Sequence, residues 1–193
     1  MSKRLLSAAL IAGLATASVS GSALAATANA VSNSSPDGTI TITGTIVGQT
    51  CKVDGKSFGT PDAITVALPT VLTSNLSSAG ATAGQKQFSI NITGCDSALS
   101  MVRTYFSGSN IDSTTGNLSN TGTAGNVQVQ LLNSDNTAID LKGADAAAQK
   151  SQVANLDSSG NATLQYSARY IANGGAASAG NVNTSVQFTM VYN

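Results

Sequence analysis

The side chains that most often carry catalysis and metal binding are missing from this sequence. It contains no His and no Glu, all nine acidic residues are Asp, and the only two cysteines are Cys51 and Cys95. General acid–base catalysis near neutral pH relies mostly on His or Glu, and zinc and non-haem iron sites are built mainly from His, Cys and carboxylates. We therefore expect a protein that is not an enzyme and that holds no cofactor.

One short segment comes closest to a metal-binding motif. Asn133-Ser134-Asp135-Asn136 places oxygen-bearing side chains close together. A calcium loop of the EF-hand type closes with a bidentate Glu, a residue type that this chain lacks. We interpret the segment as a turn and expect no bound metal.

Charged residues are sparse and balanced. Lys and Arg number nine, Asp also numbers nine, and together they make 9% of the chain, against about 25% in ordinary domains. Because no cluster of Lys and Arg is present, we expect neither nucleic acid nor membrane insertion. Ser, Thr, Asn and Gly dominate instead, which is compatible with disorder, so the hydrophobic pattern has to decide the fold.

The first 25 residues have the features of a secretory signal peptide. Lys3 and Arg4 form a positive start, an apolar stretch follows, and Ala23-Leu24-Ala25 is a small-x-small cleavage site. A transmembrane helix is the alternative, but it needs about 20 apolar residues, and Ser and Gly interrupt the stretch from Ser18 onward. We predict export, with cleavage a few residues later as an alternative.

Export gives a meaning to the two cysteines. In an oxidising compartment Cys51 and Cys95 are expected to form a disulfide, which would close a loop of about 45 residues and stabilise the fold by roughly 4 kcal/mol in the chain-entropy model. Two free thiols or a metal-binding pair are the alternatives that the sequence leaves open.

The remaining pattern is that of β-strands with one buried face. Apolar and polar residues alternate with period two in several segments, separated by Gly-, Asn-, Ser- and Thr-rich stretches. The predicted strands lie around residues 87–92, 102–106, 127–131, 139–141 and 164–170. Residues 144–152 favour one or two helical turns. The whole predicts an all-β sandwich.

The two ends of the chain carry the most informative strands. Ile40, Ile42, Gly44 and Ile46 alternate with threonines near the start, and an apolar strand from Val182 to Tyr192 ends the sequence. No charged residue follows Arg169, so an edge at this last strand would be unprotected. Either the two segments are ordinary strands of one closed sandwich, in which they could pair with each other, or the domain lacks a strand that the N-terminal segment of another molecule supplies.

At this point the sequence resembles the major pilin family of chaperone–usher (type 1-like) fimbriae. The resemblance rests on four motifs in order, and it covers essentially the whole chain after the signal peptide. These are Gly38–Val47 followed by Cys51, Phe88–Cys95, Tyr166–Tyr170, and Gly180–Asn193 with its penultimate Tyr192.

The resemblance implies an incomplete immunoglobulin-like β-sandwich of six strands, completed by a donor strand from a neighbouring subunit. We expect a signal peptide (1–25), an N-terminal extension with the donor strand (26–48) and a pilin domain (49–193). The donor residues would be Ile40, Ile42, Gly44 and Ile46. The acceptor groove would be formed by Gly180, Val182, Val186, Phe188, Met190 and Tyr192.

The resemblance also implies the function and the partners. The chain would be a structural subunit of a surface fimbria, a head-to-tail homopolymer that supports adhesion and carries a tip adhesin. A periplasmic chaperone would grip the carboxylate of Asn193, and an outer-membrane usher would exchange the chaperone for the next subunit. A minor, adaptor or tip subunit, or a carbohydrate-binding adhesin, is the alternative.

Overall fold

The computed structural model describes residues 51–57 and 63–193. By its internal contacts the chain divides into two units, Met1–Gly44 and Thr45–Asn193, and every described residue lies in the second. The predicted signal peptide and the predicted donor residues 40–46 fall outside the described residues.

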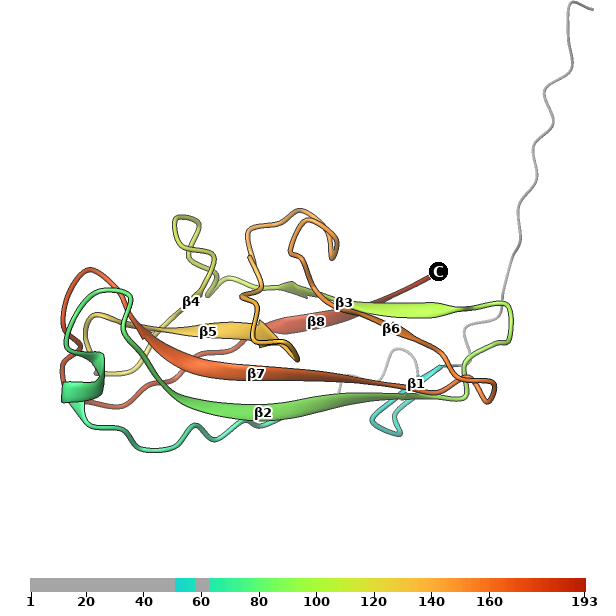
Figure 1. Cartoon of the computed structure of the whole chain (residues 1–193), viewed down its shortest axis with the longest axis horizontal. Helices are drawn as coiled ribbons and strands as arrows, with labels where there is room; N and C mark the ends of the chain where they lie inside the picture. Colours follow the sequence, from blue (N-terminus) through green and yellow to red (C-terminus); the bar gives the residue numbers. More distant parts are fainter. Residues whose placement is uncertain (1–50, 58–62) are drawn as a thin grey trace, which may run out of the picture. The chain divides into compact units, whose positions relative to one another are not determined.

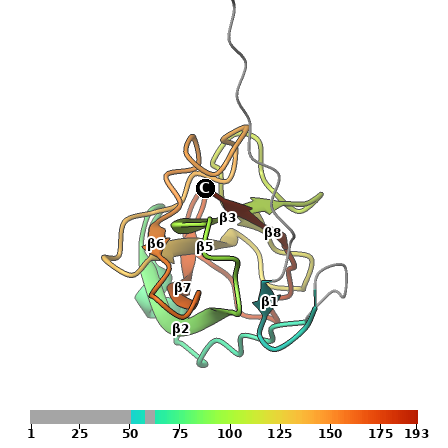
Figure 2. The ribbon, with the colours of Figure 1, turned by 90° about the vertical axis from the view of Figure 1, so that its right-hand side faces the viewer.

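Two antiparallel sheets make up the described part of the chain (Figure 1). The first has the strand order β1-β2-β7-β5-β4, and the second has the order β6-β3-β8. Seen along the strands, the two edge strands β6 and β8 of the second sheet lie on opposite sides (Figure 2). The strands are β1 (Lys52–Val53), β2 (Thr82–Thr93), β3 (Met101–Ser107), β4 (Leu118–Ser119), β5 (Val127–Asn133), β6 (Val153–Asn155), β7 (Ala162–Ala172) and β8 (Gln187–Tyr192).

The core lies between the two sheets, and the period-two pattern explains it. Ile90 and Ile92 of β2 and Leu164 and Tyr166 of β7 are fully buried, whereas the polar residues between them are mostly exposed. The ring of Phe106 from β3 packs edge-on against Tyr166, with 5.4 Å between the ring centroids. The all-β sandwich predicted from the alternation is confirmed.

The predicted disulfide is also confirmed. Cys51 and Cys95 are bonded, with 4.1 Å between their Cα atoms. The bond joins the start of the described chain to Cys95, which lies just after the end of β2, close to where the short strand β1 pairs with β2. Both sulfur-bearing side chains belong to, or pack against, the core between the sheets.

The predicted strand at residues 139–141 and the predicted helical turns at 144–152 are wrong. Ile139 and Leu141 are buried, but the only ladder contact there is an isolated bridge between Leu132 and Ala138. The buried side chain of Gln149 explains the loop, because its amide donates to Phe106 O at 2.6 Å and to Leu141 O at 3.2 Å. Residues 146–150 form turns around this side chain. The helical element among the described residues is instead η1 (Thr73–Leu76), a single 3₁₀ turn.

The last strand is shorter than the sequence predicts. β8 begins at Gln187, and this residue pairs in antiparallel fashion with Ser107 of β3. β3 ends at Ser107, so residues 181–186, which we call the lead-in segment, have no strand of their own sheet beside them. The lead-in segment nevertheless keeps the exposed/half-buried alternation of β8.

Candidate functional site

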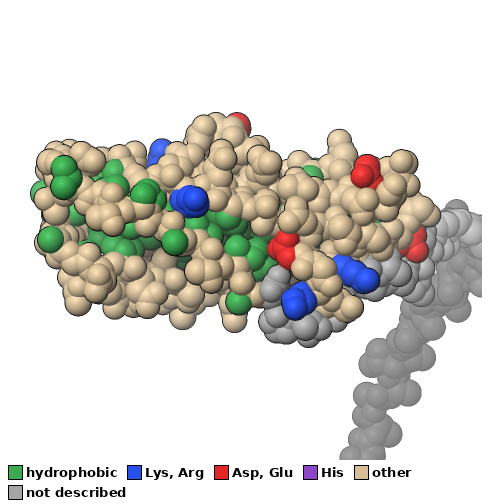
Figure 3. Space-filling view, turned by 90° about the horizontal axis from the view of Figure 1, so that it is seen from below, with side chains coloured by type: hydrophobic (Ala, Val, Ile, Leu, Met, Phe, Trp, Pro, Cys, Tyr) green, Lys and Arg blue, Asp and Glu red, His purple; other side chains and the backbone are tan. Residues whose placement is uncertain are grey.

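A groove of about 1000 Å³ opens beside β8. Its lining is mainly apolar, and in the space-filling view apolar side chains lie in a hollow of the surface (Figure 3). The groove reaches down to buried core residues such as Ile90 and Leu131. Both sheets of the sandwich therefore contribute to it, and the core between them is open along this side.

One side of the groove comes from β8 and the lead-in segment. Residues 182–190 and Tyr192 line the groove, and every second side chain of this stretch is half-buried while the residues between them are exposed. The alternation places five of the predicted acceptor residues together: Val182, Val186, Phe188, Met190 and Tyr192. These side chains pack on the core with one face and leave the other free.

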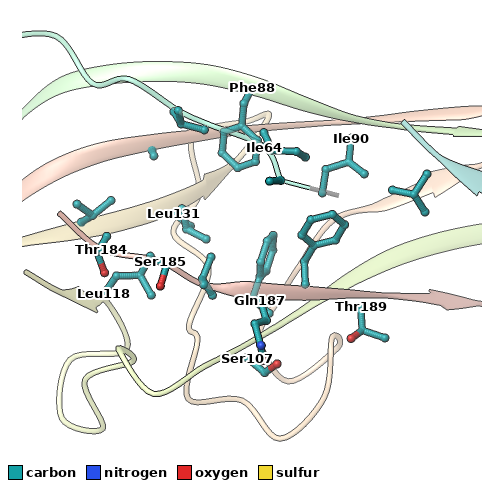
Figure 4. A pocket seen from close by; sticks show the side chains of 18 of the residues that line it. Ile64, Phe88, Ile90, Ser107, Leu118, Leu131, Thr184, Ser185, Gln187 and Thr189 are labelled. Carbon is teal, nitrogen blue, oxygen red and sulfur yellow. The ribbon is translucent and has the colours of Figure 1, made fainter. Parts of the chain in front are cut away.

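The opposite side of the groove was not predicted. Ile64, Val66 and Leu68 line it from an extended segment, residues 63–71, and they alternate with more exposed neighbours. In the close-up, Ile64 and Phe88 lie across the groove from Gln187 of β8 (Figure 4). The alternation of Ile64, Val66 and Leu68 is visible in the sequence, and it is the signal that could have revealed this side.

The backbone on both sides of the groove has free hydrogen-bonding capacity. β8 pairs with β3 on one edge, and no described strand pairs with its other edge. Among the described residues, no backbone hydrogen bond involves residues 64–71. An extended peptide laid into the groove would find unpaired N–H and C=O groups on either side, together with pockets for alternate side chains.

Gly180 does not line the groove, although it was predicted as part of the acceptor. Its φ is +156°, and a Cβ atom there would lie 2.5 Å from the backbone N of Ala124. Glycine is thus required because the chain lies in close contact with the 120–126 loop just before the lead-in segment begins.

Asn193 is held by the start of β3. Its backbone O accepts hydrogen bonds from the N–H groups of Ser100 and Met101 at 2.7 Å and 3.0 Å, and its N–H donates to Met101 O at 3.0 Å. The Ser100 hydroxyl adds a third donor at 3.1 Å. The predicted chaperone anchor is therefore fixed at the end of β8 opposite the lead-in segment.

The groove offers no charged chemistry. None of its described lining residues is Asp, Lys or Arg, and burial raises the pKa of the Tyr170 and Tyr192 hydroxyls above the usual value of 10.0. Within residues 51–57 and 63–193, no group of three or more potential metal ligands occurs. No helix in the same part of the chain is long and apolar enough to cross a membrane. The arrangement suits the binding of an apolar, extended segment.

Sequence comparison gives close relatives. The family model described as "Type-1 fimbrial protein, A" matches residues 68–193. The chain is 42% identical over 166 residues to the major fimbrial subunit SMF-1 of Stenotrophomonas maltophilia, covering 81% of this chain and 93% of that protein. It is 40% identical over 163 residues to the F17 fimbrial protein of Escherichia coli, covering 81% and 87% of the two chains.

Solved structures share the fold. One chain of a solved chaperone-usher pilus aligns with a TM-score of 0.56 at 19% identity. The alignment covers 82% of this chain and 96% of that chain. The P pilus rod subunit PapA aligns with a TM-score of 0.55 at 15% identity, covering 74% and 99%.

Proposed function

This chain belongs to the type-1 fimbrial protein family, and from that premise we propose that it is a structural subunit of a surface fimbria, joined head to tail by strand donation. The single observation that carries the proposal is the open groove between β8 and residues 63–71. Donor and acceptor surfaces differ, so each contact leaves one of each free for a further copy, and the product is an open filament as long as the rotation between copies does not close a ring.

The predicted donor segment of a second copy suits this groove in side-chain type. Ile40, Ile42 and Ile46 would enter the apolar pockets, while the missing side chain of Gly44 lets the two backbones approach. Full burial of three Ile side chains stabilises a complex by about 5–9 kcal/mol, and each backbone hydrogen bond adds roughly 0.5–1.5 kcal/mol net. Such a joint would be tight without any covalent bond.

The donor strand would run antiparallel to β8. All strand pairs in the described part of the chain are antiparallel, and antiparallel pairs are about two to three times as common as parallel ones. This direction places Ile46 at the Val182 end of the groove and Ile40 toward Tyr192. The body of the next subunit, which begins only a few residues after Ile46, would then lie beyond the lead-in segment.

The remaining assignments follow from the same proposal. Residues 1–25 would direct export, residues 26–48 would supply the donor strand, and residues 49–193 would form the acceptor domain. A periplasmic chaperone would cover the groove before assembly and contact the Asn193 carboxylate, and an outer-membrane usher would exchange it for the next copy. The finished fibre would stand on the cell surface and carry a tip adhesin, with no catalytic task for this chain.

Fibre formation by donor variants tests the proposal. We expect Ile42→Asp to abolish the SDS-resistant ladder that unheated fibres give on gels, because a carboxylate would be buried in an apolar groove. Thr41→Asp is the matched control, since in the proposed donor strand its side chain would face away from the groove and the ladder should persist. Fibres of normal length from Ile42→Asp, seen by negative-stain microscopy, would refute the donor assignment.

A further inference from the structure

The lead-in segment is held in place by a loop and not by a strand. Residues 181–186 have no partner in the sheet of β8, yet their Val182 lines the groove. The 120–126 loop supplies the missing contacts: Thr121 N–H donates to Asn183 O at 2.8 Å, and Ala124 N–H donates to Asn181 O at 3.1 Å. Both backbone neighbours of Val182 are therefore fixed from outside the sheet.

One side chain lies at the centre of these contacts. The Oδ1 atom of Asn120 accepts from the N–H of Asn183 and from the N–H of Gly122, each at 2.8 Å. Its Nδ2 atom donates to Ala124 O at 2.8 Å and to Asn181 O at 3.3 Å. All four hydrogen bonds that a half-buried amide side chain can readily make are thus used.

Two glycines show how closely the loop and the lead-in segment approach. A Cβ atom on Gly122 would collide with Asn181 O, and one on Gly180 would lie 2.5 Å from Ala124 N. The loop and the lead-in segment therefore have no room to shift against each other where the Asn120 amide joins them. The amide thus fixes the direction in which Val182 points into the groove.

We propose that Asn120 is a positioning residue for strand acceptance, because it holds the Val182 end of the groove in the shape that receives the C-terminal end of the donor segment. This inference rests on the proposed function and adds to it the donor position that Asn120 influences. Since the amide bonds to Asn181 and Asn183, and not to β8 itself, its influence falls on the donor position nearest Val182, which is Ile46 in the antiparallel arrangement.

Peptide binding to the chain without its predicted signal peptide, residues 26–193, tests the inference. A labelled peptide of residues 37–48 and the same peptide with Ile46→Ala are compared by fluorescence anisotropy, and association and dissociation rates are measured separately. We expect Asn120→Ala to release the unmodified peptide about tenfold faster with little change in association. It should leave the Ile46→Ala peptide within about twofold of its rate on the unmodified chain.

Asn133→Ala is the matched control. The Asn133 side chain makes three hydrogen bonds, with Thr137, Lys150 and Gln152, against four for Asn120, but it lies at the end of β5 and does not line the groove. It should lower the unfolding midpoint without changing the dissociation rate of either peptide. Thr123→Val, which removes only the bond from Asn181 N–H, should accelerate release in the same direction as Asn120→Ala by a smaller factor, even if Asn120→Ala folds poorly.

The outcomes separate the two proposals. Equal acceleration for both peptides, or none for either, overturns the role of Asn120 while leaving strand donation intact. If the unmodified chain binds neither peptide, or binds an Ile42→Asp peptide equally well, strand donation itself is refuted, and the role of Asn120 falls with it.

Discussion

Replacing Phe188 by Ala should separate the stability of the subunit from the strength of the joint. Phe188 lines the groove from β8, lies opposite Phe106 of β3, and is only half-buried. Truncating a fully buried Phe to Ala costs about 3–5 kcal/mol. In the free subunit most of this cost should appear, roughly 2–4 kcal/mol, because the larger part of the side chain is already buried.

The rest of the cost, about 1 kcal/mol, should appear when the donor binds. A strand inserted beside β8 would cover the exposed face of Phe188, so the variant should bind the 37–48 peptide about fivefold more weakly. Urea unfolding of residues 26–193, with and without saturating peptide, measures both quantities. Val191→Ala is the control, because Val191 is 39% exposed on the opposite face of β8 and should leave the peptide affinity unchanged.

Equal destabilisation of the free and the peptide-bound forms by Phe188→Ala would refute this prediction. Equal losses would mean that the donor does not cover this side chain, and that the half-buried row on β8 is ordinary surface. A weaker affinity for Val191→Ala than for Phe188→Ala would instead mean that the peptide binds to the outer face of the sheet.

Three further predictions concern stability. Cys51→Ser should lower the free energy of unfolding by roughly 4 kcal/mol, as expected for a bridge with a sequence separation of 44, and added reductant should then have no effect in urea titrations. Tyr166→Phe should cost about 1–3 kcal/mol, since its buried hydroxyl donates to Thr104 Oγ1 at 3.0 Å; an unchanged urea midpoint would contradict this. Hydrogen bonds, chiefly from the backbone N–H of Thr115, lower the pKa of the Asp112 carboxyl below 3.8, so this carboxylate favours folding above the unfolded-state pKa and the benefit is lost as the pH falls through the folded-state pKa. The stability difference between the unmodified chain and Asp112→Asn should therefore be constant from about pH 5 to pH 7 and shrink toward pH 3.

The long strands were predictable because local pattern and tertiary role agree in them. β2, β3, β5 and β7 contain apolar residues at alternate positions, and these residues meet in one core. The two cysteines were equally informative once export was inferred. Five side chains of the period-two row ending at Tyr192 line the groove, and their role in accepting a strand stays a prediction.

The features that the sequence pattern predicted wrongly or did not reveal share a physical cause. Ile139 and Leu141 alternate like strand residues, but their burial depends on Gln149, a polar side chain that organises a loop from the inside. Asn120 is one asparagine among many in a chain rich in this residue, and only the folded arrangement gives it four backbone partners. A single polar residue that bonds to distant backbone leaves no periodic trace in a sequence.

The position of the disulfide has a mechanical consequence. In a fibre under tension, the pull from one neighbour would enter the domain at Cys51, directly after the donor segment, and the Cys51–Cys95 bond would pass it to the end of β2. The donor strand of the next copy, lying alongside β8, would be loaded in shear, so that its hydrogen bonds resist together instead of opening one after another. In that arrangement the covalent bond would lie where the force enters, and the non-covalent joint would carry the force in the direction in which its hydrogen bonds act together.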